Sequence, residues 1–111
     1  MFKALTLNVQ GLNFPMKRKK VHSFLATSRA DVVALQETHF KSGDAYRFQS
    51  RYYTTQYHAT SRNKTKGVAI LISEHFPLKI DETIIDEEGR YVMVRGSCRV
   101  DLLTIASIYA P

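Results

Sequence analysis

Three polar residues that follow aliphatic runs could do chemistry together. Asn8 ends the run LTLN, Glu37 ends VALQE and Tyr109 ends TIASIY. Ligands gather where the strands of an α/β sheet end, and parallel neighbouring strands would bring Asn8 and Glu37 to one edge. A carboxylate beside an amide suits Mg²⁺, which prefers oxygen ligands and keeps several waters. The ordinary alternative is that Glu37 is a solvated strand end or a helix cap and that Tyr109 is a packed aromatic with a hydrated hydroxyl.

The first part of the chain predicts a strand, a helix and a second strand. A loosely alternating strand is expected over residues 2–8, and turn-forming residues then interrupt it. The helix that follows is expected to bury the positions that recur at a spacing of three to four, which are Phe14, Val21, Phe24, Leu25 and Ser28. The run DVVALQ over residues 31–36 is typical of a strand covered on both faces. Residues 4–36 therefore predict a right-handed crossover unit with parallel strands.

The rest of the chain has β texture. Residues 38–50 are polar and are expected to be a loop with about one helical turn. Five β-rich runs then follow, over residues 52–59, 67–73, 78–85, 91–96 and 100–109. Short turns separate them, so we expect an antiparallel meander in which consecutive strands are sheet neighbours. The predicted fold class is α/β (α+β), with one crossover unit followed by this meander.

Composition is that of a single soluble globular unit. The chain has 111 residues, of which 44% are hydrophobic and 23% charged, with one cysteine. These values exclude a collagen, a coiled coil and a disulfide scaffold. The longest apolar run is Val68–Ile72, far shorter than the roughly 20 residues of a membrane span, so no membrane association is expected. The interpretation is one domain over residues 1–111 in an intracellular compartment.

Charge is divided unevenly along the chain. Residues 1–66 carry a net charge of +9 and residues 67–111 carry −3. The excess of cations suggests a polyanion such as nucleic acid, although a solvated surface fits equally well. The predicted phosphate-backbone contacts are Arg62, Lys64 and Lys66, beside Tyr57 and His58, and His39 is a weaker candidate for substrate contact. For both groups the alternative is a solvated polar loop. The KRKK run is expected on a solvated helix face, although it could also serve nuclear import or DNA contact.

Five motifs occur together in a fixed order: LTLNVQGLN (5–13), ALQETH (34–39), KGVAIL (66–71), EGRYVMV (88–94) and IYAP (108–111). Through them the chain resembles the endonuclease/exonuclease/phosphatase superfamily. More narrowly, it resembles the apurinic-type endonuclease domain of reverse-transcriptase polyproteins in non-LTR (long interspersed) retrotransposons. The resemblance extends from Leu5 to Pro111.

The resemblance implies a Mg²⁺-dependent DNA endonuclease, with Mn²⁺ as a substitute ion, and thus a nuclear location. Asn8 corresponds to the residue that helps to hold the hydrogen-bond network of the active site. Glu37 corresponds to the carboxylate that binds the divalent ion, and Tyr109 to a phenol that can donate to a phosphate oxygen. Other members of the superfamily cleave phosphoinositides or sphingomyelin, and the basic first part of this chain favours DNA.

Two family motifs are absent. Catalysis in the family also uses a Gly-Asp-Phe-Asn type motif and a terminal Ser-Asp-His type motif, and neither occurs in this sequence. The chain is therefore expected to be the first half of a four-layer α/β-β/α sandwich and to be inactive alone. We expect one sheet with a bare inner face, through which the chain would associate. Two other functions stay open: a non-catalytic nucleic-acid-binding fragment, and a retroelement relic without a selected role.

Overall fold

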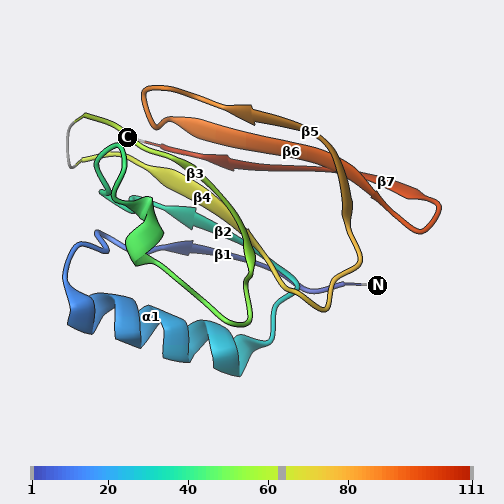
Figure 1. Ribbon diagram of the computed structural model, residues 1–111, viewed down its shortest axis with the longest axis horizontal. Helices are drawn as coiled ribbons and strands as arrows, with labels where there is room; N and C mark the ends of the chain where they lie inside the picture. The colour runs from blue at the N-terminus through green and yellow to red at the C-terminus, as the bar shows by residue number, and fades with distance from the viewer. Residues whose placement is uncertain (1, 63–64, 111) are drawn as a thin grey trace.

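The computed structural model describes residues 2–62 and 65–110 and contains two sheets (Figure 1). The four-stranded sheet has the order β1-β2-β4-β3, and the three-stranded sheet has the order β5-β6-β7. The elements in chain order are β1 (Ala4–Asn8), α1 (Pro15–Ser28), β2 (Val32–Gln36), the 3₁₀ turn η1 (Ala45–Arg47), β3 (Thr55–Ala59), β4 (Val68–Ile72), β5 (Lys79–Ile85), β6 (Tyr91–Cys98) and β7 (Asp101–Ile108). The predicted α/β class is confirmed.

The strand, helix and strand predicted for the first part of the chain are present. β1 and β2 pair in parallel, with Ala4 opposite Val32 and Asn8 opposite Gln36. Helix α1 connects them and lies against the outer face of the four-stranded sheet (Figure 1). Among the described residues, no helix, α1 included, is long and apolar enough to cross a membrane.

The predicted buried face of α1 is wrong at two positions. Val21 and Leu25 are buried, but Phe14 and Phe24 are 77% and 51% exposed. Phe14 is the residue just before the helix, because Pro15 takes its first position, where a missing N–H costs nothing. Arg18, Val21 and Leu25 are three and four positions apart and share one face of the helix. Phe24 lies at the margin of this face. The guanidinium of Arg18 donates to the carbonyl oxygens of the preceding loop.

The predicted meander is divided between the two sheets. β3 pairs with β4, and β5, β6 and β7 pair in sequence, all antiparallel as expected. The expectation that β4 and β5 are neighbours is wrong, because β4 already lies between β2 and β3. Because both edges of β4 are paired, β5 cannot be its neighbour, and the chain after Ile72 instead begins a second sheet.

The inner faces of the two sheets cover each other. The apolar residues between them are Val32, Ala59, Val68, Ile70, Ile72, Val92 and Val94, and all are buried. The expectation of a single sheet with a bare inner face is therefore wrong. A second apolar core lies between the four-stranded sheet and α1, and it includes Leu25, Leu35 and Leu71. Large apolar side chains are instead exposed on β5, β6 and β7, at Ile84, Tyr91, Leu102 and Ile108.

Candidate functional site

The ends of β1 and β2 bring Asn8 and Glu37 together. Asn8 is the last residue of β1, and Glu37 directly follows β2, so the parallel register places them side by side. The Asn8 side-chain amide donates to Glu37 Oε2 over 2.5 Å, and Asn8 Oδ1 accepts from the Gln10 backbone N–H over 3.0 Å. Because its amide is held at both ends, Asn8 fixes the orientation of the Glu37 carboxylate.

The backbone after β2 has an unusual conformation that aims Glu37 and His39. Their φ angles are +56° and +61°, which non-glycine residues rarely adopt. Hydrogen bonds hold the segment, since Glu37 O accepts from Gly11 N over 2.7 Å and His39 N donates to Lys66 O over 2.9 Å. His39 Nε2 lies 3.5 Å from Glu37 Oε1, and both side chains are partly exposed. Strain of this kind persists where surrounding contacts determine the conformation.

Tyr109 reaches the same place from the second sheet. It directly follows β7, and its backbone N–H donates to Arg90 O over 2.7 Å. Asn8, Glu37 and Tyr109 line one pocket of about 380 Å³, together with Thr6 and Gln36 among others. The structure therefore brings the three strand-end residues to a common rim, while their roles stay predictions.

The donors around this pocket suit a hydrated cation held by few protein ligands. The pocket is lined by the Glu37 carboxylate, by the side-chain amides of Asn8 and Gln36 and by Tyr109, whose side chain also packs against the apolar core between the sheets. Among the described residues, no group of three or more histidine, cysteine or acidic side chains forms a metal cluster. A site with one carboxylate fits Mg²⁺, which keeps several of its waters, better than Zn²⁺, which is held by three or four histidine, cysteine or carboxylate ligands.

A polar chain under the pocket was missed by the sequence analysis. Thr6 Oγ1 donates to Gln36 Oε1 over 3.1 Å, and Gln36 Nε2 donates to Ser107 Oγ over 3.2 Å. Ser107 Oγ in turn donates to Leu35 O over 2.9 Å. The signal that could have found these residues is a polar residue within an apolar strand run, at Gln36 in VALQ and Ser107 in IASI.

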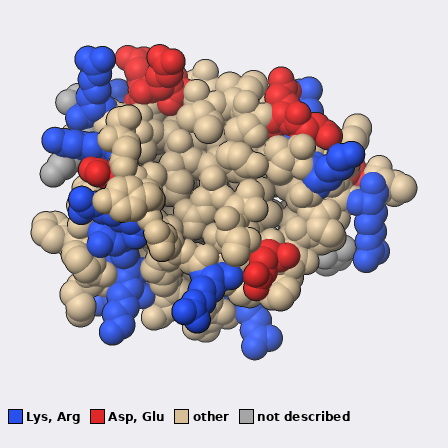
Figure 2. All heavy atoms as spheres, viewed as in Figure 1, with Lys and Arg blue, Asp and Glu red and all other residues tan. Residues whose placement is uncertain are grey.

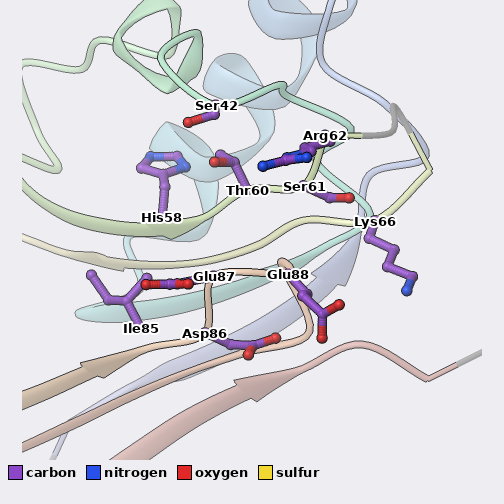
Figure 3. Close-up of a pocket in the computed structure, with 10 residues that line it drawn as sticks. All are labelled: Ser42, His58, Thr60, Ser61, Arg62, Lys66, Ile85, Asp86, Glu87 and Glu88. Carbon is purple, nitrogen blue, oxygen red and sulfur yellow. The ribbon is translucent and has the colours of Figure 1, made fainter.

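Of the predicted nucleic-acid contacts, Tyr109 lines this pocket and His39 lies beside Glu37. Arg62 and Lys66 line a second pocket of about 660 Å³, whereas Lys64 lies outside the described residues. Figure 3 shows the two cations on the β3–β4 side and the acidic β5–β6 turn, with Asp86, Glu87 and Glu88, across from them. The backbone of Lys66 is hydrogen-bonded to the segment after β2, because the Lys66 carbonyl oxygen accepts from His39 N.

Titratable groups around the second pocket have shifted pKa values. The Arg90 guanidinium, 2.9 Å from Asp86, lowers the pKa of that carboxyl to about 2. Burial lowers the pKa of His58 to about 4, so this imidazole is neutral at pH 7. Of the described residues that line the pocket, Arg62 and Lys66 therefore carry its positive charge. Figure 2 shows basic and acidic side chains close together at this end of the molecule.

Comparison with known proteins shows the family. The model of the Endonuclease/Exonuclease/phosphatase family matches residues 5–109, so the chain belongs to this family. Solved structures with the same fold include the AP endonuclease LMAP from Leishmania major, with 20% identity and a TM-score of 0.81 over 99% of this chain and 40% of that one.

Two further structures match with similar coverage. The catalytic domain of Xenopus laevis APE2 has 20% identity and a TM-score of 0.72, over 98% of this chain and 45% of that one. D. rerio TDP2 in complex with a single-strand DNA product has 18% identity and a TM-score of 0.70, over 95% and 44%. The chain thus spans less than half the length of each of these structures.

Proposed function

We propose that this chain is the N-terminal part of a Mg²⁺-dependent DNA endonuclease of retroelement type, which nicks DNA by phosphodiester hydrolysis. The observation that carries the proposal is the common rim formed by Asn8, Glu37 and Tyr109 in a member of this family. DNA as the partner is supported by the TDP2 structure, which contains a DNA product, and by the net charge of +9 in residues 1–66.

Each residue of the rim has a distinct role in this proposal. Glu37 would hold Mg²⁺ or Mn²⁺, and the bound ion would supply Lewis-acid polarisation of the scissile phosphate and offset the charge on its oxygens. Asn8 keeps the carboxylate in the orientation that the ion requires. The Tyr109 hydroxyl donates to a phosphate oxygen, and His39, 3.5 Å from Glu37, contacts the substrate. Arg62, Lys64 and Lys66 follow the flanking phosphate backbone.

The retroelement type, the nuclear location and the inactivity of this chain are proposed from the sequence. The strings LNVQGLN and KGVAIL support the retroelement type, and a DNA substrate supports a nuclear location. We expect this chain by itself to be inactive, because the Gly-Asp-Phe-Asn and Ser-Asp-His type motifs of the family do not occur in its sequence. The domain proposed for residues 1–111 is accordingly a partial one.

A second candidate is a non-catalytic nucleic-acid-binding protein. It is favoured by the net charge of +9 in residues 1–66, whereas the pocket that contains Arg62 and Lys66 is also lined by Asp86, Glu87 and Glu88. The two candidates differ in what Glu37 does. In the nuclease, Glu37 holds a metal ion, whereas in the binding protein DNA affinity is independent of this carboxylate.

The decisive experiment is a titration with Mg²⁺ followed by backbone amide NMR. The nuclease predicts shifts centred on residues 8, 37 and 109 that disappear in Glu37→Gln, a variant with the same shape and no charge. Equal shifts in the wild type and Glu37→Gln would reject the metal role and leave the binding protein. A parallel assay with supercoiled plasmid is expected to show no nicking by this chain, and Mg²⁺-dependent nicking that is lost in Glu37→Gln would overturn its inactivity.

A further inference from the structure

Ser107 lies where the two sheets meet beneath the pocket rim. It is on β7, two residues before Tyr109, and its side chain is 1% exposed. Its partners are on β2 of the other sheet, where Gln36 directly precedes Glu37. One buried hydroxyl therefore lies between the strand that ends in the carboxylate and the strand that ends in the phenol.

The Ser107 hydroxyl both donates to and accepts from residues of the four-stranded sheet. Ser107 Oγ donates its single proton to Leu35 O over 2.9 Å and accepts from Gln36 Nε2 over 3.2 Å. The amide of Gln36 is fixed at its other end, since Gln36 Oε1 accepts from Thr6 Oγ1 on β1 over 3.1 Å. The chain of hydrogen bonds thus connects β1, β2 and β7.

One further hydrogen bond joins the sheets at this end, because Gly67 N, just before β4, donates to Gly89 O, in the turn between β5 and β6, over 3.1 Å. The interface consists largely of aliphatic side chains such as Val68, Val92 and Val94. Apolar packing favours contact but is not directional, so it tolerates small shifts of one sheet against the other. Hydrogen bonds within a core are restricted to a narrow range of distances and angles, and so they can specify one relative position.

We infer that Ser107 is a positioning residue, which through Gln36 holds Tyr109 at a fixed distance from Glu37. This inference rests on the proposed function, in which the phenol and the carboxylate must act on the same phosphate. Catalytic groups lose much of their effect when misplaced by about 1 Å, so a site built from two separate sheets needs a device that fixes one sheet against the other.

The test has two measurements. Paramagnetic broadening by Mn²⁺ reports the distances of amides from the site, and a second measurement without metal reports the relative orientation of the two sheets. Mn²⁺ bound at Glu37 is expected to broaden the amide signals of residues 37 and 109 in the wild type. In Ser107→Ala, broadening at residue 109 relative to residue 37 is expected to fall by about twofold or more. Ser107→Thr, which keeps a hydroxyl, should restore the ratio, and Thr104→Ala, at an exposed position of the same strand, should leave it unchanged.

Residual dipolar couplings of the metal-free protein report the relative orientation of the two sheets. We expect both sheets to fit one alignment frame in the wild type and to deviate from it in Ser107→Ala and in Gln36→Leu, which removes the amide partner. Couplings and broadening ratios that stay at wild-type values in these variants would overturn the inference. If Mn²⁺ broadens neither signal in the wild type, the proposed metal site fails, and the couplings alone decide the role of Ser107.

Discussion

Asn8 and Glu37 are 29 positions apart in the sequence, yet the side-chain amide of Asn8 donates to the carboxylate of Glu37 over 2.5 Å. The parallel pairing of β1 and β2 produces this contact, because Asn8 lies opposite Gln36 in the register. A partner that orients a metal-binding carboxylate contributes to affinity without contacting the ion.

Asn8→Ala should therefore weaken divalent-ion binding by about tenfold without abolishing it. Isothermal titration with Mg²⁺ or Mn²⁺ measures the effect, and Gln49→Ala, at an exposed position away from the rim, serves as the control. Wild-type affinity in Asn8→Ala would show that the amide does not orient Glu37 for the ion.

Neutralising the basic residues of the second pocket should weaken DNA binding in a salt-dependent way. Each phosphate contact removed, at Arg62 or at Lys66, should reduce the slope of log affinity against log salt by about 1. Fluorescence anisotropy at several salt concentrations gives this slope. Lys79→Ala, which removes an exposed cation at the start of β5, is the matched control. A slope that changes equally in the control would mean that only net charge matters.

Stability should fall as the pH is lowered through the range set by His58. Its pKa is lowered from 6.5 to about 4 by burial, so between these values the unfolded chain binds a proton that the folded chain does not. The contribution of neutral His58 is complete above pH 6.5 and is lost toward pH 4, with a total of order 3 kcal/mol. Urea denaturation at several pH values should show a flatter profile in His58→Gln. An unchanged profile in this variant would assign the pH dependence to other groups.

Gly67→Ala should destabilise the protein more than Gly43→Ala. Both glycines have positive φ, +111° and +89°, so both substitutions cost backbone strain of about 1–3 kcal/mol. A Cβ at Gly67 would also collide with the buried hydroxyl of Thr38, whereas a Cβ at Gly43 meets nothing. The difference between the two variants in the free energy of unfolding isolates the collision. Equal losses would mean that the segment around Thr38 adapts without cost.

We expect self-association through the outer face of the three-stranded sheet, because its inner face is covered. Ile84, Tyr91 and Ile108 are exposed on the strands of this sheet. Exposed apolar patches favour association, so the apparent mass in light scattering should rise with concentration and should rise less in Ile84→Thr/Ile108→Thr. A sharp monomer that dilution does not change would show that this exposed face does not drive association.

The sequence by itself determined the local elements and the strand ends. Aliphatic runs predicted the strands around Leu7, Leu35 and Ile70, and a polar residue after each run marked Asn8 and Glu37. These features depend on residues close in sequence, whose side-chain period and turn chemistry are visible in the chain. The five ordered motifs added the family, which the comparison confirmed.

Only the tertiary structure decided how the strands are divided and what joins them. β5 does not pair with β4 because β2 and β3 already occupy both edges of β4, and Phe24 is exposed because packing sets the orientation of α1. The contact between Ser107 and Gln36 spans 71 positions. No local pattern encodes such a pair, because its energy depends on burial and on a register that exists only after both sheets have formed.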